Sequence, residues 1–418
     1  MPLPSFTQNL KINCTKNNKL VAHFVLFVCI LAEINAAVCK TKQLVLGKYE
    51  IELCVFVSCV RLKQKYLEMK LKLLACLLLI SANIFSQEIV KEKINDYLNY
   101  IEDNNGGIGS VSIYKNGQEV YNRSFGQEKL IDVTYNKDTK YQVASVTKMI
   151  TAILILELVE NSKLKLDAKL SEFYPEIQNS KKITIKNLLE HTSGLGNFAI
   201  RNGAIWVMNK VSEKEIFEEI KKQGVSFEPN EKVVYSNSAY ILLRMILEKK
   251  CRKEFHKIVY KKIVKPLNLK NFASVKSNPI NTFKSYKFKE NWNEIKDVEY
   301  LNVIGVGDIA STTNDLNTII ASLFQYKILK KQTLDLMKPT IGKEDWGRGL
   351  ALFEYGENQF FGHSGDLLGS HTRLIYSPKD KISISYATNG ERIPTNIFVE
   401  NLVSIIYNTE LKLPEIKQ

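Results

Sequence analysis

The sequence predicts an α+β fold, in which strands near both ends of the folded region build one antiparallel sheet, flanked by helices, beside a mainly helical second region. Residues 108–125 alternate apolar and polar positions around Asn116-Gly117, which is the pattern of a β-hairpin. Residues 349–387 contain several further strand-like runs. Between these two regions lie long apolar stretches at helical spacing, above all residues 147–159.

The remaining elements follow from periodicity and composition in chain order. Residues 268–300 are rich in Lys and Asn with little periodicity, so a surface insertion is expected there. No internal repeat or low-complexity linker divides the chain. The other expected elements are a helix over 87–103, a short helix within 164–195, polar helical structure over 196–230, a strand-like run over 233–237 before an apolar helix over 240–247, and an amphipathic helix over 396–407.

The first 86 residues differ in composition from the rest of the chain. They contain six of the seven cysteines, and 11 Lys+Arg against 4 Asp+Glu give them +7 of the total formal charge of +14. The longer remainder is therefore only mildly basic. It shows no basic stripe interleaved with aromatic residues, so no nucleic-acid partner is expected.

The best-formed feature near the front begins at Met69. Lys70 and Lys72 form a positive segment, residues 73–80 form an apolar segment, and Ser86 suits the position before a cleavage site. This is the layout of a secretory signal peptide. We therefore expect a non-native or unstructured extension over 1–68, a signal peptide over 69–86 and one folded domain over 87–418. The protein is then exported, either periplasmic or secreted.

Two other interpretations of the front are weaker. The apolar run from Leu20 to Cys39 is interrupted by His23 and Glu33, so no stable membrane span is expected. The run 73–76 resembles a lipoprotein cleavage box ending at Cys76, but too little apolar sequence precedes it after Met69. Beyond residue 86 only Cys251 remains, without a disulfide partner, and we expect it to be inert packing.

The pattern Ser-x-x-Lys occurs three times, beginning at Ser112, Ser145 and Ser162. Ser112 lies in an expected strand, where positions i and i+3 face opposite sides. Ser162 lies in a polar stretch. Only Ser145 opens a long apolar helix, where Lys148 lies on the same helical face, close enough to reach the hydroxyl. A buried lysine has a lowered pKa and can act as a base, although an ordinary helix start would fit each pattern equally well.

Two further patterns follow in order. Tyr-x-Asn also occurs three times, and only Tyr235-Ser236-Asn237 lies between a strand-like run and an apolar helix. His-x-Gly occurs once, at His363-Ser364-Gly365, beside a late strand.

In these motifs the chain resembles the class C β-lactamase and D-alanyl-D-alanine carboxypeptidase family, which orders them as Ser-x-x-Lys, Tyr-x-Asn, then Lys-Thr-Gly or His-x-Gly. The resemblance covers about residues 105–410 and implies a β-lactamase/transpeptidase-like fold and a serine hydrolase that forms an acyl-enzyme. Its substrate would be an amide or ester, such as a D-amino-acid peptide, a peptidoglycan fragment, an ester or a β-lactam. Matching flanks are Leu188–Leu195, Phe227–Asn230, Gly305–Thr312 and Gly362–Gly365.

The resemblance also implies the roles of individual residues. Ser145 would attack the carbonyl, and either Lys148 or Tyr235 would be the base in acylation. Tyr235, with a usual pKa of about 10, would need a nearby cation to lower it. It would then protonate the leaving group and activate the water that hydrolyses the acyl-enzyme.

The remaining implied residues bind the substrate. Asn237 would hold the substrate amide and Lys148, and His363 and Gly365 would contact the substrate from the late strand. The backbone N–H groups of Ser145 and Asp366 would form the oxyanion hole.

Three positions depart from the family pattern. His363 stands where β-lactamases usually have Lys, and it would provide only a partial charge at neutral pH. Peptidase or esterase activity is therefore favoured over efficient β-lactamase activity. Asn230 replaces a usual Gly. Asp366 follows Gly365 where a small residue is commoner, and its charge would disfavour anionic substrates if it points inward.

Other functions are less well supported. Residues 362–366 nearly spell the Gly-x-Ser-x-Gly elbow of α/β-hydrolases, but the last Gly is missing. The five histidines have no paired spacing, so no metal and no cofactor is expected, and His191 is interpreted as a structural residue of its loop. The alternative to an enzyme is a catalytically silent penicillin-fold protein that binds cell-wall peptides. The oligomeric state and the exact substrate stay open.

Overall fold

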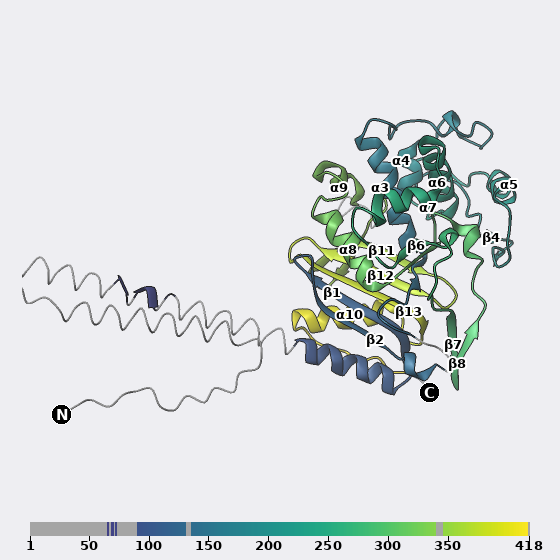
Figure 1. Cartoon of the computed structure of the whole chain (residues 1–418). Coiled ribbons are helices and arrows are strands. Elements are labelled where there is room, and N and C mark those ends of the chain that lie inside the picture. Colours follow the sequence, from purple (N-terminus) through teal and green to yellow (C-terminus); the bar gives the residue numbers. More distant parts are fainter. Residues whose placement is uncertain are drawn as a thin grey trace, which may run out of the picture. The chain divides into compact units, whose positions relative to one another are not determined.

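The computed structural model of the chain describes residues 65–66, 68–70, 72, 90–130, 135–339 and 346–416. Ile84–Gln418 forms one compact unit, and all elements below belong to it (Figure 1). The predicted extension over 1–68 and signal peptide over 69–86 fall almost entirely outside the described residues. The domain boundaries at the front of the chain therefore stay predictions.

A six-stranded antiparallel sheet, in the order β10-β11-β12-β13-β1-β2, forms the centre of this unit. β1 pairs with β13 from Gly107↔Glu391 to Lys115↔Ile382, which confirms that strands from both ends build one sheet. The β1–β2 turn is Asn116-Gly117, with φ of 54° and 77°, the left-handed pair that a two-residue turn requires. The strands are β1 (Gly107–Lys115), β2 (Gln118–Phe125), β10 (Ala351–Tyr355), β11 (Asn358–Asp366), β12 (His371–Ser377) and β13 (Ile382–Glu391).

Helices cover both faces of the sheet (Figure 1). On one face, α10 (Thr395–Tyr407) and the helical residues 90–103 share an apolar cluster with residues of β1, β12 and β13. On the other face, α8 (Thr313–Phe324) contacts the same three strands. This arrangement confirms the predicted α+β class with helices flanking an antiparallel sheet.

The helical region is organised around α3 (Thr147–Glu160), of whose 14 residues only Glu157, Val159 and Glu160 are not buried. Such a helix is enclosed on nearly all sides. It contacts α6 (Asn237–Cys251) and α9 (Lys331–Met337). No helix among the described residues is both long and apolar enough to span a bilayer. The other helices of this region are α4 (Ile185–Leu189), α5 (Glu213–Gln223) and α7 (Phe255–Val259), which continues as the π-helical turn η5 (Tyr260–Val264).

Two segments differ from the sequence-based expectation. In 196–230 only α5 is helical, and β4 (Ile200–Arg201) pairs with β5 (Ala204–Ile205) in a small hairpin. In 268–300, three strands replace the expected irregular insertion: β6 (Phe272–Ser274), β7 (Ser285–Lys289) and β8 (Asn291–Ile295). β7 contacts β13, and its Tyr286 lies in one apolar cluster with Ala387. This contact joins segments about a hundred residues apart, so local periodicity does not reveal it.

A small sheet in the order β3-β9-β6 connects the two regions. β3 (Tyr141–Gln142) pairs with β9 (Ile309–Ser311), and the chain then turns through the 3₁₀ helix η3 (Ala144–Val146) into α3. Residues 233–236, expected to be strand-like, have no regular structure and lead directly into α6. Ser145, in η3, and Tyr235, in irregular chain, thus both lie just before a buried helix.

Candidate active site

Ser145 lies in the tight turn between β3 and α3. It is the one residue of 141–150 that is not buried. Ala144 before it has φ of 48°, in the left-handed region that costs a non-glycine residue about 1–2 kcal/mol. The turn is closed by the Val146 N–H, which donates to the Val143 carbonyl at 3.2 Å. A strained turn therefore leaves the Ser145 side chain accessible at the start of a buried helix.

Lys148 lies one turn further along and is fully buried. Its Nζ is 2.9 Å from Ser145 Oγ and 3.1 Å from the Val306 carbonyl oxygen. Among the described residues no carboxylate forms an ion pair with it. Burial without a counter-charge lowers the pKa of Lys148 well below its usual value. The amine is therefore suited to accept the proton of the Ser145 hydroxyl.

The loop that presents Val306 to Lys148 is held by its neighbours. The Gly305 N–H donates to Asp308 Oδ1 at 2.7 Å, and Thr151 Oγ1 of α3 donates to the Gly305 carbonyl at 2.6 Å. Ser274 also donates to the Asp308 carboxylate. Burial raises the pKa of Asp308 to about 6, although these hydrogen bonds oppose the shift. Asp308 therefore fixes the loop whose carbonyl holds the lysine amine.

Tyr235 lies over Lys148, whose Nζ is 4.9 Å from the centre of the tyrosine ring. Burial raises the pKa of Tyr235, a hydrogen bond with Ser145 lowers it, and the charge of Asp366 raises it, so that the net shift is upward. The expectation that a nearby cation lowers this pKa is therefore wrong. Lys148, the cation that lies against the ring, is itself shifted toward the neutral amine by burial. Tyr235 keeps its proton and is suited to donate it.

Aromatic rings surround Tyr235. His191 lies 4.4 Å and Trp346 5.3 Å from it between ring centres, and Trp346 lies 5.4 Å from His363. His191 is buried and its Nδ1 accepts the Ser236 N–H at 3.2 Å. Its role in the loop is structural, as the sequence indicated. Trp346 was not predicted as a site residue. The sequence signal that could have indicated it is a rare residue type, one of three tryptophans in the chain, close to two glycines just before β10.

His363 is buried on β11, with Nδ1 2.5 Å from the Ser364 carbonyl oxygen. A carbonyl only accepts, so Nδ1 bears the proton of a neutral ring. Burial, with the nearby Lys148 as a second cause, lowers the pKa of His363 to about 3. The expectation of a partial charge at neutral pH, which rested on the usual pKa of histidine, is therefore wrong, because the ring is buried on β11.

Gly365 allows β11 to approach the nucleophile turn. A Cβ at this position would lie 2.2 Å from the Val143 carbonyl oxygen and 2.9 Å from the Ser145 amide nitrogen. No side chain fits into that space. The absence of a side chain therefore brings the backbone of β11 against the backbone of Ser145.

Asp366 is the last residue of β11, and its side chain is 66% exposed. Its Oδ1 lies 3.0 Å from His371 Nδ1, and His371 Nε2 lies 3.7 Å from Glu391 Oε1. Burial lowers the pKa of His371, but these two carboxylates outweigh it and raise the pKa. Because the Asp366 charge also affects Tyr235, its field reaches the candidate site.

Asn237 is the first residue of α6, and its Nδ2 donates to Asn197 Oδ1 at 3.0 Å. The expected contact between Asn237 and Lys148 is replaced by the Val306 carbonyl. The sequence indicated the loop 305–312 only as a matching flank and gave no role to Val306. Of the other predicted site residues, Lys148 and Gly365 approach Ser145 directly, Tyr235 lies against Lys148, and His363 lies beside Trp346.

A model of the Beta-lactamase family matches residues 101–399, which is more than half of the chain and includes every predicted site residue. The chain belongs to the Beta-lactamase family. Teichoic acid D-alanine hydrolase of Staphylococcus aureus is 24% identical over 313 residues, covering 73% of this chain and 74% of that protein.

Two solved structures share the fold of this Beta-lactamase family protein. D-amino acid amidase from Ochrobactrum anthropi SV3, complexed with L-phenylalanine amide, aligns with a TM-score of 0.66 and 21% identity, over 75% of this chain and 99% of the amidase. FmtA from Staphylococcus aureus aligns with a TM-score of 0.65 and 21% identity, over 80% of this chain and 91% of FmtA. The predicted penicillin-recognising fold is confirmed.

As a Beta-lactamase family member, the protein is a serine hydrolase that acts on amide or ester bonds.

One departure from the family pattern has a structural reason. Asn230 has φ of 69°, and asparagine tolerates the left-handed region better than most residues other than glycine. Its Oδ1 also accepts a hydrogen bond from Asn187 Nδ2 at 2.6 Å, which glycine could not do.

Proposed function

We propose that the protein hydrolyses esters or amides of D-amino acids that have a free α-amino group, through an acyl-enzyme on Ser145. The observation that carries the proposal is the buried Lys148 amine, 2.9 Å from the hydroxyl of Ser145 and without a carboxylate partner among the described residues. A base with a lowered pKa beside an accessible hydroxyl is the arrangement that activates a serine nucleophile.

In acylation, Lys148 accepts the proton of Ser145 Oγ while Oγ attacks the substrate carbonyl carbon. The developing oxyanion accepts hydrogen bonds from the backbone N–H groups of Ser145 and Asp366. The close approach of Gly365 to the Ser145 amide supports this pairing. Each such donor stabilises the transition state by about 3 kcal/mol.

Breakdown of the tetrahedral intermediate requires a proton for the leaving group. Tyr235, which retains its proton, donates it to the leaving oxygen or nitrogen, and the Lys148 ammonium returns a proton to Tyr235. The scissile bond breaks and Ser145 holds the acyl group as an ester. A water molecule then attacks this ester and its proton passes to the neutral Lys148 amine. Lys148 returns this proton to Ser145 Oγ as the ester bond breaks and the D-amino acid leaves.

The charges around the site support a substrate with an ammonium group. His363 is neutral at physiological pH, so it offers no fixed cation to a substrate carboxylate. Asp366 instead has an exposed carboxylate, paired with His371, whose charge reaches Tyr235. A free α-ammonium group two bonds from the scissile carbonyl carbon suits this field, whereas the carboxylates of β-lactams and C-terminal peptides do not.

The relatives support the same choice. The name teichoic acid D-alanine hydrolase describes hydrolysis at the D-alanine of teichoic acid, and the name D-amino acid amidase describes hydrolysis of D-amino acid amides. We further propose that the protein acts outside the cytoplasm, in the periplasm or after secretion, which rests on the predicted signal peptide over 69–86. The alternative of a catalytically silent peptide-binding protein needs neither the buried amine of Lys148 nor its contact to Ser145.

A substrate comparison on the purified protein tests the proposal. We expect D-alanine p-nitroanilide and D-alanine esters to be hydrolysed faster than their L-isomers, their N-acetylated forms and nitrocefin. Ser145→Ala should abolish turnover. Ser162→Gly is the matched control, because Ser162 begins another Ser-x-x-Lys pattern and its φ of 56° suits glycine.

Three results would overturn parts of this proposal. Faster hydrolysis of N-acetyl-D-alanine esters would remove the ammonium preference. Fast turnover of nitrocefin would make the protein a β-lactamase. Equal activity of Ser145→Ala and wild type would remove Ser145 as the nucleophile.

A further inference from the structure

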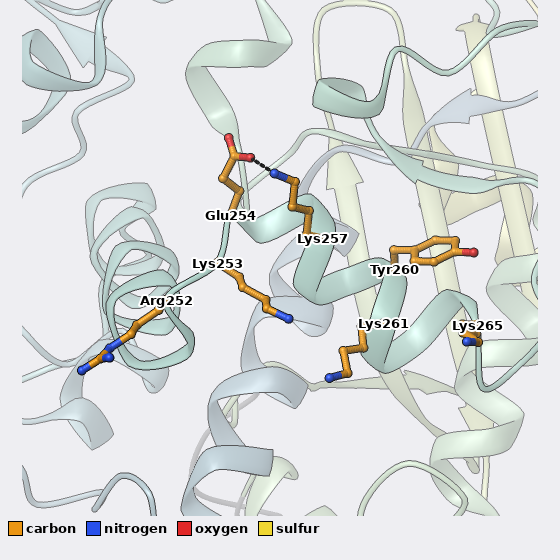
Figure 2. A pocket seen from close by; sticks show the side chains of 7 residues that line it. All are labelled: Arg252, Lys253, Glu254, Lys257, Tyr260, Lys261 and Lys265. Atoms are coloured by element: carbon orange, nitrogen blue, oxygen red, sulfur yellow. Dashed lines mark ion pairs between the residues drawn. The ribbon is translucent and has the colours of Figure 1, made fainter.

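A groove lined almost entirely by basic side chains lies at the far end of α6 from Asn237 (Figure 2). Its volume is about 630 Å³. Because α6 has 15 residues and an α-helix rises about 1.5 Å per residue, roughly 20 Å separate the groove from the Tyr235-Ser236-Asn237 segment. The groove is therefore not part of the candidate active site. The lining residues are Arg252, Lys253, Glu254, Lys257, Tyr260, Lys261 and Lys265.

The charge of this groove is poorly compensated. Five of its seven lining residues are basic and one is acidic, so the net charge is +4. The single carboxylate, Glu254, bonds Lys257 at 2.7 Å and Lys276 at 2.5 Å, so it is shared between two lysines. Among the described residues, no carboxylate forms an ion pair with Arg252, Lys253 or the two remaining lysines of the lining. Such a concentration of like charge favours an anionic partner.

Three of the lysines form a row along the backbone, although the Lys257 amine is turned toward Glu254 and the Lys261 amine toward another side of the helix (Figure 2). Lys257, Lys261 and Lys265 follow one another at intervals of four residues along α7, η5 and the turn after it, and all three are exposed. The inner side of the same segment buries Phe255, Ile258 and Ile263 in the core. Residues four apart are neighbours on a helix and about 6 Å apart along its axis.

A π-helical turn lies within this row of backbone positions. In an α-helix a row of residues four apart drifts by about 40° at each step. In η5 the Lys265 N–H donates to the Tyr260 carbonyl five residues earlier, at 2.9 Å. The larger number of residues per turn offsets the drift and returns Lys265 toward the row. Single π-helical turns of this kind occur frequently at functional sites.

Tyr260 adds an open aromatic surface to the groove. The residue is 59% exposed, and none of the described aromatic or cationic side chains is stacked on its ring. It is the only aromatic residue among the lining residues (Figure 2). An aromatic ring beside a row of cations suits a polymer that presents both anionic groups and apolar edges.

We propose that this groove binds a linear, phosphate-bearing polyanion. A row of separate cations, without a buried polar group at which they converge, fits a chain with repeated charges better than a single small anion. A flat membrane surface fits less well, because the lining is concave and contains no apolar residue besides Tyr260 that could insert between lipids. The inference does not depend on the proposed hydrolase function, since the groove is remote from Ser145.

Binding of a fluorescently labelled linear inorganic polyphosphate to the full-length protein, measured by anisotropy over a range of salt concentrations, tests the proposal. The triple variant Lys257→Glu, Lys261→Glu, Lys265→Glu should bind at least about tenfold more weakly in 0.1 M salt. Each lost phosphate contact should reduce the magnitude of the slope of log affinity against log salt concentration by about 0.7. The loss of three contacts should therefore reduce it by about 2. Tyr260→Ala should leave polyphosphate binding nearly unchanged, because this probe has no apolar edge for the ring to contact.

The matched control reverses three exposed lysines elsewhere, in the variant Lys214→Glu, Lys222→Glu, Lys287→Glu, which has the same net charge. This control should bind polyphosphate more tightly than the groove variant and with nearly the wild-type slope. The groove variant should hydrolyse a small D-alanine ester as fast as wild type does. This activity also shows that the variant is folded.

Two outcomes contradict the proposal. If both triple variants lose the same affinity, net charge and not the groove determines binding. If wild type binds phosphatidylglycerol vesicles but not soluble polyphosphate, the surface recognises a membrane and not a polymer. Neither outcome affects the proposed hydrolase function, which is measured separately with the small ester.

Discussion

Replacing Lys148 with methionine should change how the free energy of unfolding depends on pH. In the unfolded chain a lysine has a pKa of about 10.4, whereas burial lowers the pKa of Lys148 well below that in the folded protein. Between the two values the unfolded state binds the extra proton, so the free energy of unfolding of wild type rises with pH. Lys148→Met lacks this group. The stability of the variant relative to wild type should therefore fall as the pH rises toward 10, by at most about 1.4 kcal/mol for each pH unit.

Urea denaturation of both proteins at several pH values measures this difference, and contributions from all other groups cancel. The variant also leaves the Val306 carbonyl without its donor, which lowers the free energy of unfolding by about 1–3 kcal/mol. This loss is the same at every pH, so it does not change the pH dependence of the difference. Lys165→Met is the control, because the exposed Lys165 closes another Ser-x-x-Lys pattern. If the difference for Lys148→Met does not vary with pH, Lys148 is charged in the folded protein. It then cannot be the base.

Four further substitutions test the site. Asp308→Asn should gain stability relative to wild type by up to about 3 kcal/mol as the pH rises from 4 to 7. The pKa of Asp308 is raised to about 6 in the folded protein, so ionisation of the carboxyl destabilises the folded wild type over this range. Urea denaturation at both pH values measures the difference. Gly365→Ala should lower kcat/KM at least about 100-fold, because its Cβ would separate β11 from Ser145; steady-state kinetics measure it. Trp346→Phe should retain more kcat than Trp346→Ala, since a ring must support Tyr235; equal loss in both variants contradicts this. His363→Lys should raise nitrocefin turnover relative to D-alanine ester turnover, and an unchanged ratio would show that charge at this position does not select substrates.

The parts of the fold that sequence predicted are those determined by neighbouring residues. Asn116-Gly117 specifies its turn through two left-handed φ values, and the apolar run after Thr147 specifies a helix buried on nearly all sides. The same local reasoning selected Ser145 from three identical patterns, because only one of them opens such a helix. The family resemblance was confirmed by the family match over 101–399.

The parts that sequence did not predict depend on contacts between distant segments. The neutrality of His363 results from its enclosure beside Lys148 and Trp346, which lie on other elements. Val306 replaces Asn237 as a partner of Lys148 because a loop 158 residues away is fixed against α3. The β7–β8 hairpin was not predicted, because its sequence is polar and β7 is held by its contact with the distant strand β13. Periodicity within one segment contains no information about such pairings.

The location of the predicted signal peptide also matters for how the protein is made. If translation begins at Met69 and cleavage follows Ser86, the mature protein begins near residue 87. N-terminal sequencing of the exported protein should then find no peptide from residues 1–68. A mature chain that includes those residues would contradict the predicted boundaries.

The most direct test of the central claim is to locate the covalent intermediate. Wild type is quenched in acid during turnover of a D-alanine thioester, digested, and analysed by peptide mass spectrometry. We expect a D-alanyl adduct on Ser145, which Ser145→Ala lacks and Lys148→Met forms at least about 100-fold more slowly. An adduct on another residue, or turnover without any adduct on Ser145 in rapidly quenched samples, would contradict the assignment of Ser145 and Lys148 as nucleophile and base.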